Sequence, residues 1–185
     1  MPLLDEIATR WSPRAYDPRE PSEAELEEVF EAARWAMSCF NDQPWTYIVT
    51  RRSDGPLHDD AVAGLNEFNR AWAAAAPVLG YSLVRPSFAA TGKPNPHAWH
   101  DVGAASAILS IQATHLGMMV HQMAGILPQV VRERFAVPAE LEVVAGFTMG
   151  WPGDPETLPE PLRSRERAPR ERKPLSKMLV RGRFE

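Results

Sequence analysis

The chain has 185 residues, of which 44% are hydrophobic and 24% charged, so its composition is that of one ordinary globular domain. The net charge of −4 provides no general attraction for nucleic acid or for an anionic membrane, and neither is expected as a partner. A single cysteine excludes an internal disulfide, and no apolar run approaches the ~20 residues that span a bilayer, so the expected location is the cytoplasm.

The first predicted element is a short helix over residues 3–11, whose leucine, isoleucine and tryptophan side chains share one face that should pack on the core. Arg10, Ser12 and Arg14 follow at its end. These guanidinium groups and the hydroxyl can hold a phosphate dianion, because arginine presents a planar fork of donors and serine adds a neutral one. A solvated helix end is the alternative explanation.

A second helix is predicted to start after Ser22, because Glu25 three residues later completes the pattern of a capping box. Apolar side chains then recur at helical spacing and form one stripe: Leu26, Val29, Phe30, Ala33 and Met37. Pro44 forces an extended approach to a strand over residues 45–50.

The loop between this helix and this strand contains Ser38, Asn41 and Gln43. Their donors and acceptors suit a heteroaromatic ring in which carbonyl groups and ring nitrogens alternate. The alternative is a polar loop that only caps the ends of its neighbours.

A turn over residues 51–56 precedes one helix predicted over residues 59–76. Pro77 ends this helix before an apolar strand over residues 78–84. Asn69 lies on the polar side of the helix and could face a ligand or simply the solvent.

The loop over residues 85–100 is longer than an ordinary connection, and such loops are often functional. Its aromatic side chains either line a substrate mouth or anchor the loop to the core: Phe88, His97, Trp99 and His100. No metal site is expected here, because the two histidines have only Asp101 as a neighbouring ligand.

The remaining elements are predicted from periodicity. A helix over residues 101–117 has Asp101 as a plausible cap, and small residues on its other faces allow another helix to come close. A segment over 118–126, a short helix over 128–135 and a buried strand over 141–149 follow.

Residues 151–185 differ in kind, with 6 of the 18 prolines and with 9 lysines and arginines against 6 acidic residues. Composition alone would class this segment as a disordered basic arm. Because no stacking aromatic side chains alternate with its arginines, a nucleic-acid partner is set aside. Because the segment lacks the apolar periodicity needed to fold back on its own core, we expect it to dock on another subunit.

Two motifs carry a family resemblance: Arg10-Trp11-Ser12-Pro13-Arg14, and Asn41-Asp42-Gln43-Pro44-Trp45 after a helix end that contains serine. In these motifs the chain resembles the nitroreductase family of FMN-dependent oxidoreductases, and the regions around residues 101–125 and 150–173 also follow at family spacing. Three positions depart from the family pattern. Met37 replaces a frequent proline, Cys39 a frequent serine, and Ala124 a frequent acidic residue.

The resemblance implies an α+β fold of three layers, in which helices flank a mostly antiparallel sheet, and a single domain over residues 1–185 that works as a homodimer. The helix over residues 101–117 would lie at the dimer interface. The arm over residues 151–185 would cross onto the partner subunit and return its arginines to the FMN phosphate. The residues implied to bind FMN are Arg10, Trp11, Ser12, Arg14, Met37, Ser38, Cys39, Asn41, Gln43, Asn69, Ala124, Gly125, Arg170 and Arg172.

The implied activity is hydride transfer from NADPH or NADH through FMN to a small nitroaromatic or quinone-like acceptor, by a ping-pong mechanism. No catalytic residue is assigned, because the cofactor carries the chemistry while the protein sets orientation and electrostatics. The rival hypothesis is a flavin-binding storage or sensing protein that kept the fold without turnover.

Overall fold

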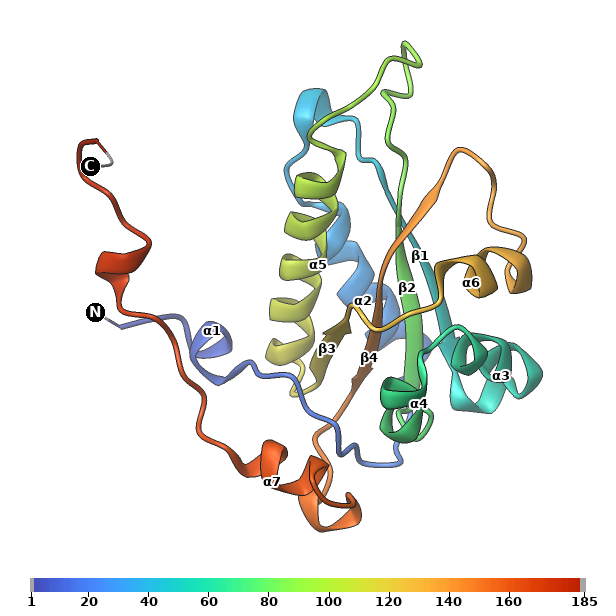
Figure 1. Ribbon diagram of the computed structural model, residues 1–185, viewed down its shortest axis with the longest axis vertical. Coiled ribbons are helices and arrows are strands. Elements are labelled where there is room, and N and C mark those ends of the chain that lie inside the picture. The colour runs from blue at the N-terminus through green and yellow to red at the C-terminus, as the bar shows by residue number, and fades with distance from the viewer. Residues whose placement is uncertain (1, 184–185) are drawn as a thin grey trace.

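A four-stranded antiparallel sheet lies at the centre of the computed structural model, which describes residues 2–183 (Figure 1). The strands run in the order β1-β2-β4-β3. Their bounds are β1 Trp45–Arg51, β2 Val78–Val84, β3 Met119–Met123 and β4 Glu142–Gly150. The helices are α1 Asp5–Thr9, α2 Glu23–Arg34, α3 Pro56–Ala63, α4 Glu67–Ala73, α5 Ala98–His115, α6 Pro128–Arg134 and α7 Leu162–Arg167. Over this described range, no helix is both long and apolar enough to cross a membrane.

Helices cover both faces of the sheet and complete three layers (Figure 1). On one face, α2 and α5 pack through side chains such as Val29 and Leu109. On the other, α3, α4 and α6 pack through Ala61, Trp72 and Val131. The inner strand β2 is buried along its whole length, as its mostly apolar sequence leads one to expect. The α+β class and the mostly antiparallel sheet between helices are confirmed.

The second helix begins as predicted. The Ser22 hydroxyl accepts the backbone N–H of Glu25 at 3.3 Å, and the Glu25 carboxylate accepts the backbone N–H of Ser22 at 2.8 Å. Met37 is an exception to the predicted stripe, because the helix ends at Arg34 and Met37 lies exposed beyond it.

The single helix predicted over residues 59–76 is two helices. Gly64 ends α3, and the Asn66 side chain starts α4 by accepting the backbone N–H of Asn69 at 2.9 Å. A Cβ at Gly64 would lie 2.5 Å from the Tyr81 hydroxyl, so the close approach of α3 to the sheet excludes a side chain there. Apolar spacing alone conceals this break, because both helices turn apolar residues toward the same core.

The longest helix, α5, also departs from the prediction at both ends. It begins at Ala98, so Asp101 lies in its first turn, where its carboxylate accepts the backbone N–H of Cys39 at 3.0 Å instead of capping the helix. At the other end, His115 Nδ1 lies 2.9 Å from the Glu6 carboxylate of α1. No side chain within α1 is buried, so the prediction that this helix packs an apolar face on the core is wrong.

The arm that starts at residue 151 packs partly on its own chain. Leu158 and Leu162 are buried in the same cluster as Trp72. The expectation that the arm makes no contact with its own core is therefore wrong as far as α7. Residues 167–183 are exposed and run past α1 away from the body of the molecule (Figure 1). The docking of this outer part on a partner stays a prediction.

Candidate functional site

Residues from both ends of the chain line one hollow of about 260 Å³. Six of the residues predicted from the sequence to bind the cofactor lie there: Arg10, Trp11, Ser12, Arg14, Arg170 and Arg172. Arg165 and Glu166 of α7 complete the lining. We call this the arginine hollow. The fold thus brings the upstream motif together with the arm of the same chain, whereas the family resemblance implies the arm of a partner subunit.

Arg170 reaches the hollow from its own chain. Its guanidinium donates to the carbonyl oxygen of Arg10 at 2.6 Å and also to that of Ala8. These contacts bring Arg170 to the hollow of its own chain, and its docking at the site of a partner subunit stays a prediction. Arg172 lies beside it and donates to the neighbouring carbonyl oxygen of Glu171 at 2.7 Å, which leaves most of its donor fork facing the hollow and the solvent.

The positive charges of the hollow act against one another. Burial lowers the pKa of Arg10, and the nearby cations Arg172 and Arg170 lower it further. Arg10 also donates to the Ser12 hydroxyl at 3.3 Å, so the two donors point into one region. An anion placed in the hollow would relieve this repulsion, because it would favour the charged form of each guanidinium.

Glu166 is a residue of the hollow that the sequence analysis missed. Its Oε1 accepts the backbone N–H groups of Arg14 at 2.8 Å and Ala15 at 3.1 Å, and its Oε2 lies 3.6 Å from Arg14 Nη1. The side chain is buried, so it fastens α7 of the arm to the Arg10–Arg14 segment. The only available signal in the sequence was an acidic residue inside a run of arginines.

His121 of β3 supports the same segment from the side of the sheet. Its Nδ1 donates to the carbonyl oxygen of Pro13 at 2.8 Å, and its ring packs on Trp72 with 4.6 Å between ring centroids. The Arg14 guanidinium lies 5.9 Å from the centroid of the same tryptophan. Burial lowers the pKa of His121 to about 4, and the charges of Arg14 and Arg10 act in the same direction. The imidazole is therefore neutral at pH 7, and no sequence pattern singled it out.

Asn69 and Gly125 meet between α4 and the end of β3. The Asn69 amide donates to the carbonyl oxygen of Gly125 at 3.0 Å, and Asn69 is only 7% exposed. The alternative that Asn69 simply faces the solvent is therefore wrong, and its contact with a ligand stays a prediction. A Cβ at Gly125 would lie 2.5 Å from the Asn69 amide nitrogen, which explains why only a glycine fits at this position. Ala124 beside it is exposed.

The loop over residues 37–43 lies at the N-terminal end of α5. The Ser38 hydroxyl accepts the backbone N–H of Gln43 at 3.0 Å, and the Gln43 amide donates to the carbonyl oxygen of Asn41 at 3.1 Å. Phe40, Asn41 and Gln43 have φ values of 52°, 56° and 48°, a left-handed conformation that is uncommon outside glycine. Such strain collects at functional sites, where the surroundings hold the backbone in place. We call this segment the polar loop.

A hollow of about 250 Å³ adjoins the polar loop. It is lined by Met37, Ser38, Cys39, His97, His100 and Asp101. His97 and His100, which the sequence placed in the long loop, therefore do lie beside the predicted cofactor residues, although His100 belongs to α5. Among residues 2–183, no three histidine, cysteine or acidic side chains cluster as metal ligands.

The arginine hollow and the polar loop lie at opposite ends of α5. Cys39 is bound to Asp101 in the first turn of the helix, and α1 is bound to His115 in its last turn. The helix between these contacts rises about 21 Å, at about 1.5 Å per residue. Figure 1 shows the same arrangement, with the loop before β1 at one end of α5 and the N-terminal segment at the other. One chain therefore collects the predicted residues in three groups: the arginine hollow, the polar loop, and Asn69 with Ala124 and Gly125.

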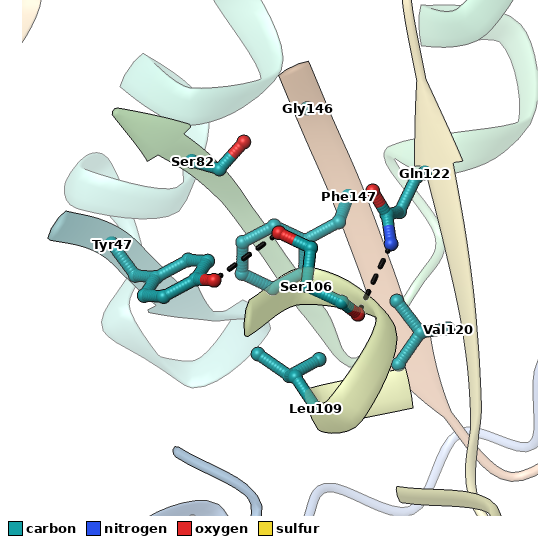
Figure 2. Close-up of a pocket in the computed structure, with 8 residues that line it drawn as sticks. All are labelled: Tyr47, Ser82, Ser106, Leu109, Val120, Gln122, Gly146 and Phe147. Atoms are coloured by element: carbon teal, nitrogen blue, oxygen red, sulfur yellow. Dashed lines mark hydrogen bonds between the residues drawn. The ribbon is translucent and has the colours of Figure 1, made fainter. Parts of the chain in front are cut away.

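A third cavity lies between α5 and the sheet, and Figure 2 shows its lining. The Tyr47 hydroxyl lies 3.1 Å from the Ser106 hydroxyl, and the Gln122 amide donates to the Ser106 carbonyl oxygen at 3.2 Å. Its volume of about 10 Å³ has room for roughly one water molecule. This cavity is too small for a cofactor or a substrate.

Comparisons with known proteins agree with this geometry. A model of the nitroreductase family matches residues 7–151. A crystal structure of an oxidoreductase containing FMN has a TM-score of 0.93 and 34% identity, over 100% of this chain and 94% of that one. A 15.4 kDa uncharacterized protein of Mycolicibacterium smegmatis is 34% identical over 145 residues, which are 75% of this chain and 96% of that protein.

A functional relative matches over a shorter stretch. The major NAD(P)H-flavin oxidoreductase of Aliivibrio fischeri is 31% identical over 72 residues, so the match spans 37% of this chain and 33% of that protein. The family model, in contrast, covers most of the chain. The chain belongs to the nitroreductase family.

Proposed function

We propose that this protein is an FMN-dependent oxidoreductase that works as a homodimer, takes hydride from NADPH or NADH and reduces a small nitroaromatic or quinone-like acceptor. The observation that carries this proposal is the arginine hollow, where Arg10, Arg170 and Arg172 surround a space large enough for a phosphate group. The names of the FMN-containing structure and of the flavin oxidoreductase relative support the same assignment. The single cysteine is compatible with the cytoplasmic location that we include in the proposal.

The residues present fit the phosphate end of FMN. The lowered pKa of Arg10, caused by burial and by two neighbouring arginines, marks a site where positive charge lacks a balancing anion. Arg10, Ser12 and Arg172 would donate hydrogen bonds to the phosphate. Arg14 would not be a main hydrogen-bond donor to the phosphate, because its guanidinium already contacts Glu166 and Trp72.

The ring end of FMN would lie toward Asn69 and Gly125, which connect to the arginine hollow through α4 and Trp72. The polar loop supplies the remaining predicted ring contacts, but it lies at the other end of α5 of the same chain. We infer that each site takes its polar loop from the second subunit. Each FMN would then contact both chains.

The surface of the chain favours such a dimer. Trp35, just before the polar loop, is 75% exposed, and Met37, its first residue, is 68% exposed. The outward face of α5 carries Gly103, where an added Cβ would meet nothing within 4 Å, so a second helix could approach closely. Large exposed apolar side chains next to one another mark an interaction surface.

When bound, FMN would supply the hydride chemistry, accepting electrons from the nicotinamide and passing them to the acceptor. The residues of this chain would bind the phosphate, fix the ring and leave one ring face open to donor and acceptor in turn. No acid or base of the protein is needed for hydride transfer itself, because the cofactor carries that chemistry. This agrees with a site built of arginines, amides and backbone groups.

An anaerobic reduction experiment tests the proposal. The purified protein should carry a flavin absorption band that bleaches when NADPH or NADH is added and returns when a quinone is admitted. A bound flavin that neither nicotinamide can reduce would favour the storage or sensing protein. A preparation that neither retains nor rebinds FMN would contradict the proposal.

A further inference from the structure

The segment from Arg85 to His97 forms a folded projection instead of a loose loop. Ser87 and Pro94 pair across it, and the backbone N–H of Phe88 donates to the Lys93 carbonyl oxygen at 2.9 Å. Gly92, with a φ of 68°, closes the turn at the tip and donates to the Phe88 carbonyl oxygen at 2.8 Å. Figure 1 shows this segment rising beyond the N-terminal end of α5, beside the loop that precedes β1. We call it the finger.

An ion pair fastens the finger to the polar loop. Arg85 Nη2 donates to the Asp42 carboxylate at 3.1 Å and to the Asp42 carbonyl oxygen at 3.2 Å. The other carboxylate oxygen accepts the backbone N–H of Ala89 at 2.9 Å. The Asp42 side chain is only 7% exposed, so solvent screens this pair little. Asp42, which belongs to the polar loop, therefore binds the finger at two points, the Arg85 guanidinium and the Ala89 backbone.

The same contact presents two aromatic rings at the surface. Phe40 and Phe88 meet edge to face, with 5.8 Å between ring centroids and an interplanar angle of 70°. Phe40 is 91% exposed and has a φ of 52°, so the chain holds a large apolar side chain in water in an unfavourable backbone conformation. It stands between Cys39 and Asn41, which are both predicted to contact the flavin ring.

We propose that Asp42 and Arg85 are positioning residues that fix the finger against the polar loop, and that Phe40 and Phe88 contact the electron acceptor and favour acceptors with a fused aromatic ring. The proposal rests on the proposed function. An acceptor that lies on a flavin held beside Cys39 and Asn41 would be next to Phe40, which lies between them in the chain, and to its ring partner Phe88. Ring edges and faces arranged in this way bind flat aromatic molecules by offset and edge-to-face contacts.

Acceptor selectivity tests the assignment. The variants Phe40→Leu and Phe88→Leu remove each aromatic face but keep an apolar side chain, and Leu57→Ala removes an exposed apolar side chain of α3 as a matched control. Steady-state rates are measured with 1,4-naphthoquinone, 1,4-benzoquinone and ferricyanide. The ratio of kcat/KM for naphthoquinone to that for ferricyanide should fall by about 2- to 12-fold in each phenylalanine variant, which is the range for one aromatic pair.

Three further measurements separate this role from a structural one. The FMN content should stay at the wild-type value in both phenylalanine variants, and the rate of anaerobic flavin reduction by the nicotinamide should stay at the wild-type value in Leu57→Ala. Phe88→Tyr, which keeps the ring, should retain the wild-type ratio. Asp42→Asn and Arg85→Met should lower the same ratio, because the finger is then no longer fixed to the polar loop.

Two results would overturn the inference. One is a selectivity ratio in Phe40→Leu and Phe88→Leu equal to that of Leu57→Ala. The other is a loss of the dimer in size-exclusion chromatography without a change in selectivity, which would assign the rings to the subunit interface. If the wild-type protein reduced ferricyanide with a nicotinamide donor but its variants kept their selectivity, the inference alone would fail. If the wild-type protein reduced no acceptor, the proposed function would fail.

Discussion

Replacement of Arg172 by alanine gives the most direct test of the arginine hollow. A hydrogen bond to a charged group contributes roughly 1.5–3 kcal/mol. Arg172 is exposed, so solvent screening favours the lower end of this range, about 1.5 kcal/mol. The Kd for FMN should therefore rise by about 13-fold in Arg172→Ala.

The structure also predicts how this effect depends on salt and on the ligand. The charge interaction extends about 30 Å at 0.01 M salt but about 8 Å at 0.15 M, so the difference between variant and wild type should be larger at low salt. Riboflavin lacks the phosphate and should bind the variant and the wild type equally well. Titration of the apoprotein with each flavin, followed by flavin fluorescence, measures both effects.

Arg181→Ala is the matched control, because it removes one positive charge from the same exposed arm nine residues further along. Its Kd for FMN should stay near the wild-type value. If Arg172→Ala and Arg181→Ala bound FMN equally at both salt concentrations, the arginine hollow would not be the phosphate site. The same would follow if riboflavin and FMN were weakened to the same extent.

Other contacts give further predictions. Glu166→Gln should lower the free energy of unfolding by roughly 1–3 kcal/mol, since two backbone N–H groups and Arg14 lose a charged partner, and an unchanged urea midpoint would contradict this. The pKa of His121 is lowered from 6.5 to about 4, so its contribution to stability is present above pH 6.5 and is lost as the pH falls toward 4. His121→Gln should remove a dependence of up to about 1.4 kcal/mol per pH unit in that window, and equal slopes for variant and wild type would count against it. Cys39→Ser should keep flavin reduction by NADPH or NADH intact, and a loss of orders of magnitude would show a redox role for the thiol. Truncation after Lys173 removes exposed Met178 and Leu179, so it should loosen the dimer yet leave Arg170 and Arg172 in place, as light scattering and FMN content would show.

Local signals in the sequence predicted most of the fold. The capping box at Ser22 and the buried run of β2 depend on neighbours along the chain, so pattern and structure agree there. The break between α3 and α4 was missed, because Gly64 is needed for its approach to Tyr81 and not for any local turn. Contacts between distant segments leave little trace in spacing or composition.

The residues of the candidate site also divide into those that local motifs predict and those that only the structure reveals. Arg10 and Arg172 were predicted from motifs and do line one hollow, whereas Glu166 and His121, which hold that hollow in shape, were not. A buried carboxylate that accepts backbone N–H groups from a segment more than 150 residues away has no local pattern. Residues predicted to touch a ligand come from motifs, but residues that position them emerge only from the packing.

The direction of the arm bears on how a dimer would be assembled. The family resemblance implies that the arm brings its arginines to a second subunit, whereas in the single chain the buried Leu158 and Leu162 and the contact of Arg170 with Arg10 place them beside their own Arg10–Arg14 segment. The phosphate end of a site can therefore be complete within one subunit. The polar loop cannot reach that end, because about 21 Å of α5 separates the two. If the proposed function is correct, we expect the polar loop with its finger to be the element that a second subunit supplies to each site.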